Sequence, residues 1–173
     1  MGYVHDVNMS AKVSLEKIKT TVGTWAIAAA SNVWSLNHTA AADVSVNHIP
    51  IDLPFQDTAD TVKGAKLTSV DIWYTVGTAD VNDMTMVLQK VTLPATGGAV
   101  PTVSTPAVTY DSNHDTAAKR KANGATMHKM TITLTTPIWV GGSDEVYVEN
   151  TCDAAASSVV KIYAVRANFT LRL

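Results

Sequence analysis

Apolar and polar residues alternate with a period of two over most of this chain, and this alternation restricts the folds open to it. The segment 165–173, VRANFTLRL, shows it best: Phe169, Leu171 and Leu173 alternate with polar residues. Successive side chains of a β-strand point to opposite faces. The sequence therefore predicts a strand here, with Phe169, Leu171 and Leu173 toward the core or a subunit interface. Its two arginines are expected on the opposite face, where acidic neighbours can pair with them.

The same alternation recurs in about eight segments that are separated by turn residues. Two neighbouring runs, 65–76 and 84–93, carry apolar rows from Val70 to Val76 and from Met84 to Leu88. A short polar turn joins them, so we expect these two runs to pair as a hairpin. Later runs begin at His128 and after the Gly-Gly turn at residues 141–142.

The composition favours β-structure and a weakly charged surface. Ala, Thr and Val together supply well over a third of the chain, and charged residues are only 16% of it, against about 25% in ordinary globular proteins. β-Branched residues pack well on pleated sheets. We therefore expect one all-β domain, an antiparallel two-sheet sandwich of jelly-roll-like topology with about eight strands. A charge-poor surface is typical of proteins that are partly covered by a partner.

One short helix is expected inside a long connection. Asp115 or Thr116 can cap its start, the residues from Ala117 to Ala122 continue it, and Gly124 stands where a left-handed residue would end it.

Residues 1–20 differ from the sandwich expected over 21–173. They mix charged and apolar residues, with Val13, Leu15 and Ile18 as the candidate anchors. A short helix is one interpretation, but an extended arm is favoured. Such an arm needs another surface to order it, and a neighbouring subunit is one candidate.

Several classes of function are disfavoured. The net charge of -2 argues against a general binder of nucleic acid or of anionic membranes. No apolar stretch approaches the ~18 residues of a spanning helix, and no signal peptide is visible at the start. A single cysteine, Cys152, excludes an intrachain disulfide and a cysteine-based zinc site. No cofactor is implied.

Metal and catalytic motifs are also missing from the sequence. The five histidines are scattered, and His128 is expected to be a hydrogen-bonded core or interface residue. The run DSNHDT at 111–116 begins like a calcium loop but lacks its glycine and glutamate, so turn closure and helix capping are favoured. The basic run Lys119–Lys121 is expected on a solvated face. With no nucleophile motif present, we expect no enzymatic activity.

Tryptophans supply the candidate contact residues. Trp73 and Trp139 do not follow the apolar parity of their strands, so an exposed position is expected for each. Exposed tryptophans serve as ligand platforms or as subunit contacts, and the low charge favours a subunit contact. The candidate interface residues are therefore Trp73, Trp139, Phe169, Leu171, Leu173, Val13, Leu15 and Ile18.

Three segments carry a resemblance to a known class of protein. KGAKLTSVDIWYTVGTADV, HDTAAKRKANGATMHKMTITLTTPIW and YAVRANFTLRL together resemble small β-sandwich structural proteins of tailed-bacteriophage particles. The resemblance covers roughly residues 60–173. It implies a virion component such as a capsid decoration, or cement, protein. Such a protein is commonly trimeric, and its partner is the major capsid protein or another virion protein.

The leading hypothesis is thus a structural protein located in the virion, which self-associates and binds a capsid lattice. The alternative is a receptor- or carbohydrate-binding module of a phage fibre or appendage. The alternative predicts exposed aromatic residues gathered in one concavity, since fold alone does not separate the two.

Overall fold

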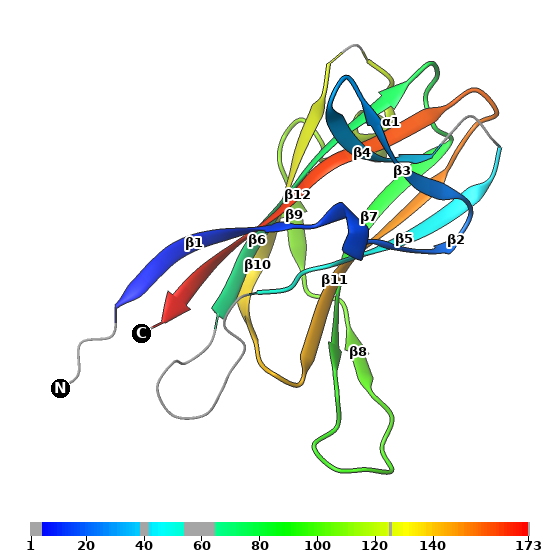
Figure 1. Cartoon of the computed structure of the whole chain (residues 1–173). Coiled ribbons are helices and arrows are strands. Elements are labelled where there is room, and N and C mark those ends of the chain that lie inside the picture. Colours follow the sequence, from blue (N-terminus) through cyan, green and yellow to red (C-terminus); the bar gives the residue numbers. More distant parts are fainter. Residues whose placement is uncertain (1–4, 39–41, 54–64, 125, 173) are drawn as a thin grey trace.

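The protein is an all-β sandwich of two antiparallel sheets, as the computed structural model in Figure 1 shows. The structure describes residues 5–38, 42–53, 65–124 and 126–172, without the side chain of Arg172. The elements are, in chain order, β1 (Asp6–Val13), η1 (Leu15–Lys17), β2 (Lys19–Val22), β3 (Trp25–Ala30), β4 (Val33–His38), β5 (Val44–Pro50), β6 (Ala65–Gly77), β7 (Asp83–Thr92), β8 (Thr102–Ser104), β9 (Val108–Tyr110), α1 (Ala117–Lys121), β10 (His128–Val140), β11 (Asp144–Asp153) and β12 (Val159–Arg172).

Eight of these strands form one long antiparallel ribbon that is rolled up. β4 pairs with β12, β5 with β11, β6 with β10, and β7 with β8. The β4–β12 and β6–β10 pairs lie together in the larger sheet, in the order β3-β4-β12-β6-β10-β9. The β5–β11 and β7–β8 pairs lie together in the smaller sheet, in the order β2-β5-β11-β7-β8. This wrapping is a jelly roll, and it confirms the expected two-sheet sandwich.

The hairpin expected between residues 65–76 and 84–93 is wrong. β6 pairs with β10 and β12 in the larger sheet, whereas β7 pairs with β11 and β8 in the smaller one. In a rolled ribbon, consecutive strands of one arm fall in opposite sheets. The turn after Gly77, where Thr78 has a φ of 71°, therefore carries the chain across the sandwich.

Four further strands extend the ribbon, so the described residues form twelve strands where about eight were expected. β3 and β9 are added at the two ends of the larger sheet, and β2 at an end of the smaller one. β1 lies along β12, on the same side of it as β4.

The segment expected to be a separate arm, residues 1–20, belongs to the sandwich over its described part. It is extended, as the sequence favoured, except for the single turn η1. Its ordering surface lies in the same chain. β1 pairs with β12 from Asp6↔Arg172 to Val13↔Val165, and β2 pairs with β5. Figure 1 shows β1 and the end of β12 side by side. Residues 1–4 lie outside the described residues.

The core lies between the sheets and is built from the apolar rows that the alternation predicted. Fully buried residues include Val70, Ile72, Tyr74 and Val76 of β6, Met84, Met86 and Leu88 of β7, Met130 and Ile132 of β10, and Phe169 of β12. Each strand contributes every second side chain to the space between the sheets.

The helix begins where the sequence predicted and ends differently. The hydroxyl of Thr116 accepts a hydrogen bond from the backbone N–H of Lys119, which caps the first turn. Ala122 has an extended conformation, with φ of -64° and ψ of 132°. The described backbone has positive φ at only two glycines, Gly23 and Gly98, so Gly124 does not act as a left-handed cap. Its N–H instead donates to the carbonyl of Val76.

Candidate interaction surfaces

The connection between β7 and β8 projects from one end of the sandwich (Figure 1). We call residues 91–105 the β7–β8 hairpin. The strands pair only from Lys90↔Ser104 to Thr92↔Thr102, and the loop beyond them contains two prolines and the glycine pair 97–98. Because prolines cannot donate to a ladder and glycines weaken it, the strands end there.

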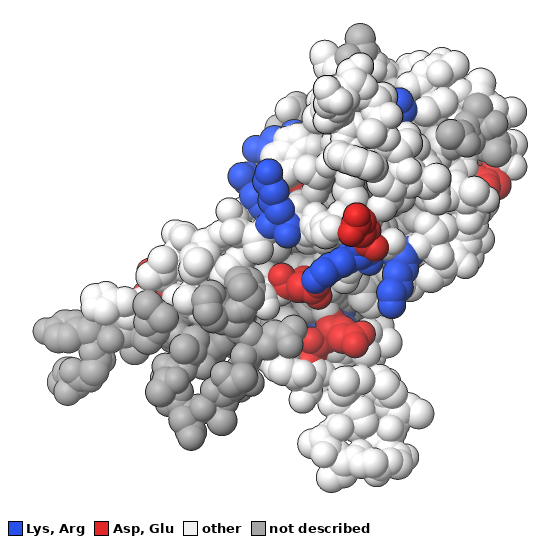
Figure 2. All heavy atoms as spheres, in the orientation of Figure 1, with Lys and Arg blue, Asp and Glu red and all other residues white. Residues whose placement is uncertain are grey.

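The β7–β8 hairpin is apolar and carries no charge. No Asp, Glu, Lys or Arg occurs from Val91 to Tyr110. Leu93, Val100 and Val103 are 43%, 81% and 63% exposed. Figure 2 shows the projection as a continuous surface of uncharged residues. Burying such a surface against a partner costs no desolvation of charge.

A second uncharged surface lies on β3 and β4, and we call residues 25–38 the β3–β4 hairpin. Ser31 and Asn32 form its turn with φ of 50° and 65°, the two positive values that a two-residue type I′ turn requires. Ile27, Val33 and Trp34 are 39%, 50% and 63% exposed. No Asp, Glu, Lys or Arg occurs from Thr20 to Ala42.

The two tryptophans expected to be exposed lie outside the core and under basic side chains. Trp139 is 38% exposed, and Nζ of Lys66 lies 5.7 Å from its ring centroid. Trp73 is half-buried on the outer face of β6, with Nζ of Lys129 at 5.6 Å and Cζ of Arg166 at 5.1 Å from its ring centroid. Both rings are therefore cation–π partners within the chain.

The other six candidate contact residues give a different picture. Phe169, Leu171 and Ile18 are core residues, with 1%, 6% and 8% exposure. Of the two positions expected for Phe169 and Leu171, core or interface, the structure shows the core. None of the three is therefore available as a contact residue. Val13 and Leu15 are half-buried against the same core. Leu173 lies outside the described residues.

Sequence reasoning missed the exposed apolar residues of the two hairpins. Their signal is present in the sequence as two long runs without charged residues, 20–42 and 91–110. Alternation alone could not reveal them, because it assigns every apolar side chain of a strand to the core face. The structure shows that Ile27 and Trp34 are exposed although they share a face with the buried Leu36. Val103, which pairs with Val91, is exposed on the outer face of the smaller sheet.

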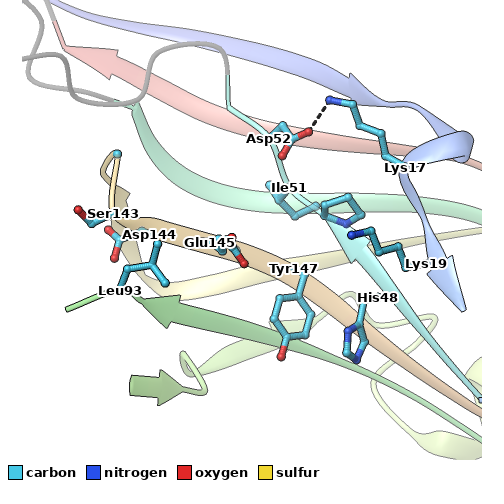
Figure 3. A pocket seen from close by; sticks show the side chains of 13 residues that line it. Lys17, Lys19, His48, Ile51, Asp52, Leu93, Ser143, Asp144, Glu145 and Tyr147 are labelled. Carbon is cyan, nitrogen blue, oxygen red and sulfur yellow. Dashed lines mark hydrogen bonds and ion pairs between the residues drawn. The ribbon is translucent and has the colours of Figure 1, made fainter. Parts of the chain in front are cut away.

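A groove of about 440 Å³ runs over the smaller sheet. Figure 3 shows its lining, with Lys17 and Lys19 on one side and the turn at Ser143 on another. Lys17 pairs with Asp52. His48 stacks on Tyr147 with ring centroids 4.7 Å apart, and its Nε2 lies 3.4 Å from Glu149. The groove thus offers one aromatic pair with charges of both signs around it.

Asp144, one of the carboxylates that line the groove, has a shifted pKa. Burial alone would raise its pKa, but hydrogen bonds from Thr92 and Gly141, together with Lys90, lower it below the ordinary value. A general acid at neutral pH requires a raised pKa. Asp144 is therefore an ionised structural group that closes the turn between β10 and β11.

Two histidines that are distant in sequence meet in a buried chain of polar groups. Nδ1 of His114 lies 2.8 Å from Asp111, and its Nε2 lies 3.2 Å from Nδ1 of His128. Nε2 of His128 lies 3.0 Å from the carbonyl oxygen of Ala122. The expectation that His128 is hydrogen-bonded is confirmed. The sequence could not show its contact with His114, because an intervening helix brings them together.

Each outer ring nitrogen of this histidine pair faces an oxygen acceptor. A carboxylate and a carbonyl only accept, so the outer nitrogen of each ring must carry a hydrogen. The two inner nitrogens, Nε2 of His114 and Nδ1 of His128, lie 3.2 Å apart and face each other. Both ends are thereby occupied by Asp111 and Ala122, so the arrangement anchors the 111–123 connection to β10 and leaves no ring nitrogen to activate a nucleophile.

The remaining polar candidates also have structural roles. Asp111 accepts from the N–H groups of Asn113 and Thr131, so the turn interpretation of DSNHDT is confirmed. In the basic run, Lys119, Arg120 and Lys121 donate to the carbonyls of Ser112, His114 and Asn82. These contacts attach the helix to the sandwich.

Other chemistry finds little support in the described part of the chain. Its His, Cys, Asp and Glu side chains form no group of three or more that could hold a metal ion. Burial raises the pKa of Cys152 to about 12, so its thiol is protonated at neutral pH. None of the described helices is long and apolar enough to cross a membrane. No protein-family model matches the sequence, and no curated protein matches it.

Proposed function

We propose that this chain is a non-enzymatic structural protein of a virus particle, of the capsid decoration type, which self-associates and binds a capsid lattice. The observation that carries the proposal is the pair of uncharged hairpins, with Val100 and Trp34 as their most exposed apolar residues. Patches of this kind on a soluble domain are typical of protein–protein contact sites. The jelly roll is compatible with the proposal, since it occurs in viral capsid domains as well as in lectins.

The mechanism follows from the placement of the hairpins on a rigid sandwich. Each hairpin presents apolar side chains that a partner can bury without desolvating charge. A single contact of this size is weak. Repetition over a lattice makes later contacts intramolecular, so many weak contacts give strong total binding. A shell held in this way resists expansion.

The test is the hydrodynamic mass of the wild type and of hairpin variants. Val100→Lys with Val103→Lys, and separately Trp34→Lys, place a charge in each surface and should lower the oligomer mass in sedimentation velocity. Val44→Lys is the matched control, because Val44 is 52% exposed and lies in neither hairpin. The mass also tests the trimer that the resemblance implies.

Particle binding is the second readout. We expect the wild type to sediment with virus particles from the same source, and the two hairpin variants to remain in the supernatant more than the control does. A wild type that stays monomeric over a wide range of concentration and never sediments with particles would overturn the proposal.

The groove on the smaller sheet supports the alternative, a glycan-binding module. The stacked His48 and Tyr147 can contact a sugar ring, and Glu145 and Lys19 line the same groove. The tryptophans do not gather there, since none of the four lines this groove. A glycan array with the wild type and Tyr147→Ala tests it: affinity that is lost in the variant would favour this alternative.

A further inference from the structure

β1 is the longest edge strand among the described residues. It pairs with β12 over eight residues without a register shift, and among the described strands β12 is its only partner. The other outermost strands, β2, β3, β8 and β9, have three to six residues. In an antiparallel ladder alternate residues point their N–H and C=O groups away from the partner. β1 therefore presents a long row of backbone groups along its far edge.

The core-side face of β1 is also apolar and open. Val7 and Met9 are 43% and 38% exposed. Their ladder partners, Leu171 and Phe169, are 6% and 1% exposed. The apolar row of the larger sheet thus continues outward from the core onto the edge strand.

β1 lacks most of the features that usually protect an edge strand, apart from its two charged side chains. It contains no proline or glycine, and its ladder has no bulge. Its only charged residues are one of each sign, Asp6 and Lys12. A strand with these properties can accept another strand by β-sheet augmentation.

The order of residues in β1 identifies the incoming strand as a second β1. If a second β1 runs antiparallel to the first with the two Met9 residues opposite each other, Asp6 lies opposite Lys12, Val7 opposite Ala11, and Asn8 opposite Ser10. Charge then meets opposite charge, apolar residues meet apolar residues, and polar residues meet polar residues. An isologous two-fold contact requires this self-complementarity.

We propose that two copies of this chain associate by antiparallel pairing of their β1 strands about a two-fold axis at Met9, which joins their larger sheets into one. The proposal rests on the self-association proposed above and adds to it a contact that lies outside the two hairpins. Two Asp6–Lys12 pairs form across the axis, one on each side of it. Val7, Met9 and Ala11 of both copies then lie on one apolar face.

Other registers are less favourable. A shift by one residue moves every side chain of the second strand to the other face, so Val7 and Met9 would meet polar residues. Placing the axis at Asn8 or at Ser10 keeps the faces but moves Asp6 away from Lys12 of the second copy. Only the axis at Met9 keeps the apolar residues of both strands on one face and also places Asp6 opposite Lys12 of the second copy.

A charge-swap cycle tests this pairing. Asp6→Lys or Lys12→Asp alone puts like charges opposite each other twice in the dimer, and each should weaken dimerisation about tenfold in sedimentation equilibrium. The double variant Asp6→Lys/Lys12→Asp restores both pairs and should return the dimer constant to within about threefold of the wild type. Thermal unfolding of each variant at low concentration checks that the monomer is folded.

The rescue cannot arise within one chain. Six residues along a strand span about 20 Å, which is more than twice the screening length of about 8 Å at physiological salt. Recovery in the double variant therefore reports a contact between copies. Equal or additive weakening in the double variant would overturn the proposed register.

Cysteine cross-linking gives an independent measurement. Met9→Cys places two thiols opposite each other at the axis, and mild oxidation should yield a disulfide-linked dimer. Val7→Cys is the matched control, since it is equally exposed on the same face. Its nearest copy would be four residues away in register, about 13 Å, so it should cross-link much less. The native thiol, Cys152, is buried.

The outcomes separate this proposal from the proposed function. If the wild type dimerises and the charge-swap and cysteine variants show no register dependence, the β1 contact is wrong and self-association through the hairpins stands. If the wild type is monomeric at all concentrations, the β1 contact is wrong, and the proposed function is overturned as well when the protein also fails to sediment with particles.

Discussion

Asp71 shows how one buried carboxylate connects three strands. It is 4% exposed on the outer face of β6. Arg166 donates to it through Nη2 at 2.6 Å, Thr131 through its hydroxyl at 2.8 Å, and Asn168 through its amide at 3.1 Å. Burial alone would raise the pKa of Asp71, but these hydrogen bonds lower it. The expectation that an arginine of the last strand pairs with an acidic neighbour is confirmed at Arg166.

The substitution Asp71→Asn should lower the free energy of unfolding by about 1–3 kcal/mol, because it leaves the Arg166 charge without a counter-ion. The lower part of the usual range is expected, since the Arg166 side chain is 37% exposed and solvent screens it. Urea denaturation measures the change. Asp52→Asn is the control: its pair with Lys17 is more than half exposed, and it should cost well under 1 kcal/mol. Equal costs would show that Asp71 is not a structural link.

At the level of elements, the passage from β2 to β3 carries the chain from one sheet to the other within two residues. Gly23 makes this possible with a φ of 79°, a value that side chains rarely adopt. A Cβ at Gly23 would lie 2.6 Å from Cβ of Ser45, and 3.0 Å from its Cα. The close approach of the two backbones is thus part of the crossing.

Gly23→Ala should destabilise the protein by about 2–4 kcal/mol, since it combines an unfavourable φ with a clash against backbone. Gly97→Ala is the matched control, because no atom lies within 4 Å of its Cβ position. The control should change the unfolding midpoint little. A similar small change for both variants would contradict the tight crossing.

β12 is the central element of the larger sheet. It pairs with β6 along one edge and with β4 and β1 along the other. Removal of residues 168–173 would take away the buried side chains of Phe169 and Leu171 and expose the edges of β1 and β6. We expect this truncated chain to be insoluble or unfolded by far-ultraviolet circular dichroism. A cooperative thermal transition in the truncated chain would refute the central role of this strand.

At the scale of the whole molecule, the pKa shifts make stability depend on acid in two ranges. Burial and His114 lower the pKa of His128 from its ordinary 6.5. Below pH 6.5 the unfolded chain therefore takes up a proton that the folded chain does not, and stability falls. Asp71, Asp111 and Asp144 have pKa values below the ordinary 3.8. Their contribution is present above that pH and is lost as the pH falls below it.

We therefore expect the free energy of unfolding to decrease from pH 7 to pH 5.5, and to decrease again below about pH 4. Chemical denaturation across this range measures both steps. In His128→Gln the first decrease should be smaller, while the second should remain. Stability that rises between pH 7 and pH 5.5 would contradict the sign derived for His128.

The local features of the fold were predictable from the sequence. Alternation selects which side chains of β6, β7 and β11 face the core, because it depends only on the two-residue repeat of a strand. The capped start of the helix at Thr116 was predictable for the same reason, since the cap bonds a residue three positions away. The low content of charged residues and the abundance of Ala, Thr and Val were sufficient to predict the all-β fold class.

Only the tertiary structure decided which strands pair and which apolar residues remain exposed. Closing the ribbon into a jelly roll places β6 and β7 in different sheets, and no local pattern encodes this separation. The tertiary structure also leaves apolar side chains of the two hairpins and of the core-side face of β1 exposed. Trp34, Val7 and Met9 share a face with buried core residues and are exposed nevertheless. Val33 and Val103 instead lie on the outer faces of their sheets. Which residues of the core-side face are covered depends on tertiary packing, because alternation fixes only the side of the strand and not what lies against it.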